Sequence, residues 1–265
     1  MSSASDSTSR WWEFYVVRYG MGTVVGAVIV FMLCKLSPTL APMLFQAGKD
    51  TDPTLDSATL VLLGVYGLAY CYLASAPILV FHAARHQMFD EHPPKHRALR
   101  LLVLALASAL AACVLPQPTS VEENTQRLLK LAIGIGSMVM LVQWHDVVSL
   151  LHKNGAQKNF DFYKTLTQQR NTEKTSIVES YRHLREHGNS FLIVVFELLL
   201  ALVMFAVSKA YGHMTGLYLL TTVFLWVLPA ALIWFVGSKL EHLFAFPPTA
   251  TTQTPASTTQ PQSGP

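Results

Sequence analysis

Residues 210–238 read AYGHMTGLYLLTTVFLWVLPAALIWFVGS and contain no Lys, Arg, Asp or Glu. A second segment of this kind, SATLVLLGVYGLAYCYLASAPILVFH, occupies residues 57–82. A run of about 20 apolar residues is what a helix needs to cross the hydrocarbon core of a bilayer. These two segments therefore predict an integral membrane protein.

The rest of the composition agrees with this class. Hydrophobic residues make up 51% of the 265-residue chain and charged residues 13%, against roughly 25% charged residues in soluble domains. The apolar segments predict an all-α, polytopic membrane protein with about six transmembrane helices. We expect these helices at residues 14–36, 59–81, 101–115, 128–151, 190–208 and 214–236, of which 101–115 is the shortest. Pro229 is expected to kink the last helix.

The first ten residues are rich in serine, and the apolar stretch after them has no obvious small-residue cleavage site. We therefore expect no cleaved signal peptide, and the first span serves as its own insertion signal. Trp11, Trp12 and Tyr15 are expected to anchor it at the membrane interface. The three cysteines, Cys34, Cys71 and Cys113, all fall in apolar stretches, where we expect small hydrophobic side chains rather than disulfides.

The distribution of Lys and Arg predicts the orientation, because cytoplasmic loops contain an excess of both. Most of them fall in the predicted loops 82–100 and 152–189. We expect these loops and both termini, at 1–13 and 246–265, on the cytoplasmic side of a bacterial inner membrane. The tail at 246–265 has no charged side chain and is rich in Pro, Thr, Ser and Gln, a composition typical of disorder.

Residues 152–189 are the one sizeable segment outside the predicted spans. Its apolar residues recur at intervals of three and four, as in two amphipathic helices. We expect a cytoplasmic helical hairpin that continues the fourth span, turns near 169–172 and returns into the fifth. Its candidate residues for sensing a nucleotide, a nucleic acid or an anionic lipid are Lys164, Arg170, Lys174, Arg182 and Arg185. The alternative is that these residues serve topology alone, since acidic residues offset more than half of their charge.

Glu197 is the most informative single residue. It lies about two turns inside the predicted fifth span, where an ionisable side chain is costly unless it has a partner or water. It is expected either to line a pore or move a proton, or to be a buried carboxyl bonded to another helix. Both interpretations stay open from the sequence.

A second polar cluster, Gln143, Trp144, His145 and Asp146, lies near the end of the predicted fourth span. Gln143, Asp146 and Leu150 share one helical face, which we expect to point into the protein. Gln143, His145 and Asp146 join Glu197 as candidates for a pore or proton path. The alternative is an interfacial tryptophan with polar neighbours at the level of the lipid headgroups.

Other motifs have simpler explanations. The spacing of His82, His86, His92 and His96 could suit a metal, but Pro93 and Pro94 interrupt any helix and no cysteine joins the set, so we expect no metal site. Glycine pairs in three predicted spans are expected to allow close helix packing. They are Gly22 and Gly26, Gly64 and Gly67, and Gly134 and Gly136.

Enzymatic chemistry is not expected, and neither is a cofactor. The segment Gly134-Ile135-Gly136-Ser137 is similar to the glycine-serine motif of rhomboid proteases, but the predicted sixth span contains no histidine to activate Ser137. The chain also has no His-Glu-x-x-His motif and no phosphate-binding loop of the Gly-x-x-x-x-Gly-Lys type.

The basic stretch Lys153 to His187 leads through Arg185-Glu186-His187-Gly188-Asn189 into the span that contains Glu197. This layout resembles the channel-forming effectors of bacterial antiphage systems, including the DNA-gated kind. The resemblance implies a homo-oligomeric ion channel in the lipid bilayer that is gated by a nucleotide or nucleic acid and serves antiviral defence. The alternatives are a proton-coupled secondary transporter and a non-catalytic membrane scaffold.

Overall fold

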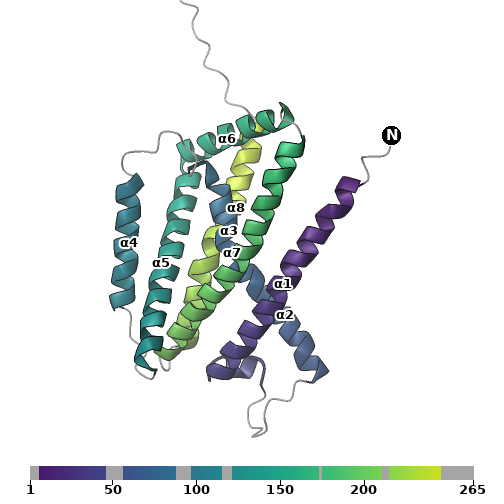
Figure 1. Ribbon diagram of the computed structural model, residues 1–265. Helices are drawn as coiled ribbons and strands as arrows, with labels where there is room; N and C mark the ends of the chain where they lie inside the picture. The colour runs from purple at the N-terminus through teal and green to yellow at the C-terminus, as the bar shows by residue number, and fades with distance from the viewer. Residues whose placement is uncertain are drawn as a thin grey trace, which may run out of the picture.

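The computed structural model describes residues 6–45, 56–87, 97–114, 121–172, 175–210 and 215–245, with side chains for all of these except 6–18, 97–101, 153, 170–172 and 175–187. The described part is a bundle of helices without strands (Figure 1). Its α-helices are α1 (Asp6–Leu36), α2 (Ser57–Ala74), α3 (Ala76–Ala83), α4 (Arg97–Val114), α5 (Glu123–Leu151), α6 (Lys153–Thr172), α7 (Thr175–Ala210) and α8 (Thr215–Ala245). Two short 3-10 helices, η1 (Ala41–Met43) and η2 (Arg85–Gln87), follow α1 and α3.

Among the described residues, five segments are long and apolar enough to cross a membrane: Tyr19–Leu36, Ser57–Ala83, Glu123–Leu151, Gly188–Ala210 and Thr215–Ala245. The described part of the chain is therefore all-helical, and its long apolar helices are typical of a membrane protein. The expected span at 101–115 is not among the five. Arg97 and Arg100 occupy the first turn of α4, so its apolar part, Leu102–Val114, is short. That part rises only about 20 Å, against about 30 Å for the hydrocarbon core.

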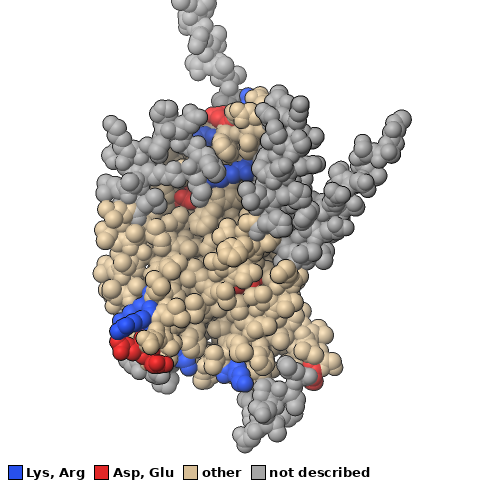
Figure 2. All heavy atoms as spheres, viewed as in Figure 1, with Lys and Arg blue, Asp and Glu red and all other residues tan. Residues whose placement is uncertain are grey.

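The outer surface of the bundle is apolar. Large hydrophobic side chains point outward from several helices, including Val24 of α1, Val61 of α2, Leu106 of α4 and Trp234 of α8. Figure 2 shows charged side chains gathered towards the two ends of the bundle, with few in the broad tan surface between them. Such a surface suits contact with lipid.

Buried residues of α1, α2, α3, α5, α7 and α8 form the central core. Trp226 of α8 is fully buried there, and its ring meets that of Phe196 of α7 edge-on with centroids 6.1 Å apart. Phe196 also lies against Phe81 of α3, at 6.3 Å between ring centroids. Val147 of α5 completes the same cluster. α4 lies at the edge of the bundle beside α5 (Figure 1).

The helices α1 and α2 cross at glycines. A Cβ atom added to Gly26 would lie 2.5 Å from the carbonyl oxygen of Gly67, and one added to Gly67 would collide with the backbone of Thr23. The backbones thus touch where no side chain intervenes, which confirms the predicted close packing for this pair. Gly64 is an exception, because its missing Cβ would meet nothing within 4 Å.

The segment expected as one helix at 59–81 is broken. α2 ends at Ala74 and α3 begins at Ala76, with Pro77 in the first turn of α3. Proline has no N–H to donate and its ring collides with the carbonyl four residues earlier, so it favours a kink or break in the helix at this point. The buried indole Nε1 of Trp226 donates a hydrogen bond to the carbonyl oxygen of Ala74 at 3.2 Å, which satisfies an acceptor at the break. Pro229 lies within α8, which is continuous from Thr215 to Ala245.

The fourth span was expected to continue directly into the segment 152–189, but it does not. α5 ends at Leu151, His152 is extended with ψ of 146°, and α6 then crosses one end of the bundle (Figure 1). Gly155 permits this bend, because a side chain there would collide with the carbonyl oxygen of Ser149. By contrast, α7 is one helix of 36 residues. Residues 175–189 therefore lead directly into the fifth span, as predicted. The tail at 246–265 lies outside the described residues.

Candidate functional site

Glu197 is fully buried in the middle of α7. The preceding residue, Phe196, belongs to the central core, and the following residue, Leu198, is exposed. Successive residues of a helix differ by about 100° in direction, because there are 3.6 residues per turn. The side chain of Glu197 therefore leaves α7 on a different side from Phe196, towards α1 and α2.

The carboxyl group of Glu197 lies where α1, α2 and α7 meet. A Cβ atom added to Gly22 of α1 would lie 3.2 Å from its Oε1 atom and would collide with the Sγ atom of Cys71 of α2. The phenol of Tyr70, one residue earlier on α2, donates a 2.8 Å hydrogen bond to the backbone carbonyl of Glu197. Gly22 thus leaves the space that the carboxyl and the thiol share.

The carboxyl group of Glu197 has few polar neighbours among the described residues. The thiol of Cys71 lies beside it, but no described residue gives either oxygen a hydrogen bond of normal geometry. An ionised carboxyl without partners is costly inside a membrane protein. A proton or a small cation bound at Glu197 would remove that cost.

The break between α2 and α3 lies next to this site. Tyr70 and Cys71 belong to the last turn of α2, directly before Ser75. The carbonyl group at the break is bonded to Trp226, which also packs on Phe196, the neighbour of Glu197. Trp226 therefore connects the break to α7 at the residue that precedes Glu197.

The second predicted cluster lies elsewhere. Gln143 and Leu150 are fully buried and Asp146 is 8% exposed, so the predicted shared face of α5 is confirmed. Neither the amide oxygen nor the amide nitrogen of Gln143 has a hydrogen-bond partner among the described residues. Asp146 is instead paired with His145, whose Nδ1 lies 3.2 Å from its Oδ1.

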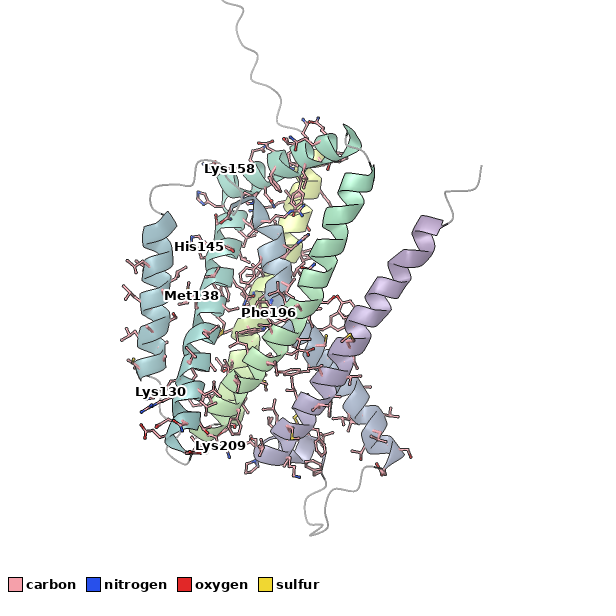
Figure 3. All side chains as sticks on the ribbon, viewed as in Figure 1. Lys130, Met138, His145, Lys158, Phe196 and Lys209 are labelled. Atoms are coloured by element: carbon pink, nitrogen blue, oxygen red, sulfur yellow. The ribbon has the colours of Figure 1, made fainter. Side chains whose placement is uncertain are left out.

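The two predicted clusters lie at different levels. In Figure 3, Phe196 lies near the middle of the bundle, whereas His145 lies closer to the end crossed by α6. Lys130 of α5 is exposed near the opposite end (Figure 3). The described structure therefore pairs Glu197 with neither residue.

Of the predicted sensing residues, Lys164 has a described side chain, which is exposed on α6. The side chains of Arg170, Lys174, Arg182 and Arg185 lie outside the described part of the chain. His92 and His96 lie outside it as well, and the described residues contain no group of three or more metal-binding side chains.

The sequence marks Glu197 as a candidate residue but does not reveal its neighbours. Gly22 was expected to serve only packing, and Cys71 only as a small hydrophobe. The charge of Glu197 within an apolar run was the available signal, whereas its contacts with α1 and α2 join residues far apart in the sequence. Comparison with protein-family models, curated proteins and solved structures finds no match for this chain.

Proposed function

We propose that this chain is a membrane transport protein in which Glu197 binds a proton or small cation during transport. The observation behind the proposal is the fully buried carboxyl whose two oxygens lack a normal hydrogen bond from the described residues. Ionisable groups inside membrane-spanning helices are functional by default, because their burial is costly. A purely structural role would be served better by a paired carboxyl or an apolar side chain.

A proton-coupled secondary transporter is the form that the geometry supports best. Glu197 is enclosed by three helices of one chain, and α2 and α3 form a broken span beside it. Broken helices next to a buried binding site are typical of secondary transporters, in which they allow the site to face each side in turn. In this proposal, movement of α2 about the break at Ser75 changes the access of Glu197 to the two sides of the membrane.

A gated ion channel in an oligomer is the second candidate. It is favoured by the apolar outer faces of α1 and α2, represented by Val24 and Val61, which other copies of the chain could cover. Glu197 and Asp146 lie on different helices, α7 and α5. A conduction path at Glu197 would therefore have to pass between α1, α2 and α7. Sensing of a nucleotide or nucleic acid through Lys164 and its neighbours, and a role in antiviral defence at a bacterial inner membrane, stay predictions of this second candidate.

Proton flux into liposomes that contain the purified protein tests the proposal. A pH-sensitive dye inside the liposomes reports uptake under an imposed membrane potential, with and without small metabolites on either side. Wild type and Glu241→Gln are expected to take up protons, because Glu241 is exposed at the end of α8. Glu197→Gln, which keeps the shape of the side chain but cannot bind a proton, is expected to fall to the leak of empty liposomes.

The same preparation separates the alternatives. Uptake that saturates and requires a solute gradient supports a carrier, whereas unitary current steps in planar bilayers support a channel. Equal flux in wild type and Glu197→Gln would overturn the role of the carboxyl. If no form conducts while all of them assemble normally, the chain is better explained as a scaffold.

A further inference from the structure

The helix α6 covers the end of the bundle with one face. Ala156 and Asn159 are buried, and the hydroxyl of Tyr163, one turn further, lies 3.4 Å from the carbonyl oxygen of His82 at the end of α3. α6 packs against α5, α8 and η2. Polar groups enclosed between α6 and these elements therefore have few routes to water.

Arg85 of η2 is one of these groups. Its guanidinium carbon lies 5.0 Å from the ring centroid of Tyr163 and 5.7 Å from that of Phe162, as in a cation–π contact. Its Nε atom is buried and has no hydrogen-bond partner among the described residues. No described carboxylate forms an ion pair with it. The two rings thus hold the side chain in place, and its charge has no counter-ion among the described residues.

Asn159 is the second group. It is fully buried, and neither its amide oxygen nor its amide nitrogen has a partner in the described part of the chain. It precedes Phe162 and Tyr163 by three and four residues, so it shares a helical face with the rings that hold Arg85. A buried amide with no partner is destabilising. Its presence here indicates that a partner is supplied from outside the described structure.

Both signs of charge are present at this end, with Lys158, Lys164 and Lys239 beside Asp161 and Glu241. The Nζ atom of Lys239 of α8 is bonded to the carbonyl oxygen of Leu151, at the junction of α5 and α6. On α6, Asp161 is exposed and accepts a hydrogen bond from Gln157 at 3.1 Å, so it does not neutralise Arg85. Guanidinium and amide N–H groups are the usual donors to phosphate oxygens.

We propose that Arg85 and Asn159 form a binding site beneath α6 for a phosphate group. The guanidinium supplies charge-assisted hydrogen bonds and the amide of Asn159 supplies a further N–H donor. Because Asn159 is covered, the phosphate reaches it when α6 moves away from the bundle. His152, the single non-helical residue between α5 and α6, permits that movement. The phosphate belongs either to a lipid headgroup or to a soluble molecule, since the site lies at an end of the bundle.

Thermal unfolding of the full chain in detergent tests the site with two probes, phosphatidylglycerol and inorganic phosphate. Wild type is expected to gain stability, seen as a rise in Tm, from at least one probe. A rise with the lipid alone assigns the site to a headgroup, and a rise with inorganic phosphate assigns it to soluble phosphate. Wild type that gains stability from neither probe overturns the proposal.

Variants separate this site from general binding of anions to a basic surface. Arg85→Gln and Asn159→Leu are expected to lose the rise in Tm, and Asn159→Leu is expected to be at least as stable as wild type without a probe, because it removes an unpaired buried amide. The matched control is Lys158→Gln, which removes a positive charge from the exposed face of the same helix. It is expected to keep the full rise. A rise that survives in Arg85→Gln and Asn159→Leu overturns the proposal.

Discussion

Two acidic residues of the described membrane-spanning helices, Asp146 and Glu197, have opposite surroundings. Asp146 lies near the end of α5, is slightly exposed and is paired with His145. Glu197 lies in the middle of α7, is fully buried and has no normal hydrogen bond to its carboxyl oxygens from the described residues. The sequence offers both as candidates for the same path, but only Glu197 is left in need of a partner.

The two acids differ in the residues that surround their carboxyl groups. Asp146 finds its partner on its own helix, in the adjacent residue. Glu197 faces Gly22 and Cys71, which provide space and a weakly polar thiol but no charge. An intramembrane acid is thus a stronger functional candidate when its neighbours on other helices cannot satisfy it.

The largest expected effect is the contrast between the two acids in transport. Glu197→Gln should abolish proton uptake, whereas Asp146→Asn should keep most of it, because Asp146 already has a partner and lies outside the three-helix site. Uptake into liposomes, normalised to the amount of folded protein, measures both. Equal losses in the two variants would mean that Asp146 and Glu197 belong to one path after all.

The next effect concerns the space beside Glu197. Gly22→Ala should displace Cys71 and the carboxyl of Glu197, and overpacking of this kind costs about 1–3 kcal/mol of stability. Transport should fall as well, because the carboxyl is moved. Gly20→Ala is the matched control on the same helix, since a Cβ there meets nothing within 4 Å. If Gly22→Ala unfolds at the same temperature as Gly20→Ala, the three helices do not meet as described.

These tests rest on features that the sequence predicted to different degrees. Long apolar runs predicted the helical membrane class, and the charge of Glu197 within such a run marked the candidate site. Pro77 signalled the break in the second span, although the segment was expected to be one helix. The bend at His152 was not predicted, although Gly155, whose backbone lies close to Ser149, is a local signal for it.

The neighbours of Glu197 could not be predicted for a related reason. Tyr70 and Glu197 are separated by 127 positions, and their hydrogen bond depends on how two helices are turned towards each other. Periodicity gives the buried face of each helix, as it did for Gln143 and Asp146 on α5. It does not specify which residue of another helix that face will meet.

A smaller effect is expected at Gln143, a fully buried residue that resembles Glu197 in shape but is neutral. Both polar atoms of its amide lack partners in the described structure. Gln143→Met keeps a similar volume and removes an unpaired polar group, so stability should rise by about 1 kcal/mol. Thermal unfolding in detergent measures this, and transport should stay near the wild-type level. A fall in Tm would show that the amide of Gln143 is hydrogen-bonded in the folded protein. Gln143 would then, like Glu197, be a buried polar residue that requires a partner.

The smallest effect is expected at the pair that distinguishes Asp146. His145 and Asp146 are 3.2 Å apart, and the imidazole side chain is 35% exposed. Partly exposed ion pairs contribute only about 0–1 kcal/mol, so His145→Gln should shift the unfolding temperature little. A double-mutant cycle with Asp146→Asn measures the coupling between them. Coupling well above that range would mean that the carboxyl of Asp146 depends strongly on the imidazole of His145, and that the contrast with Glu197 rests on this one contact.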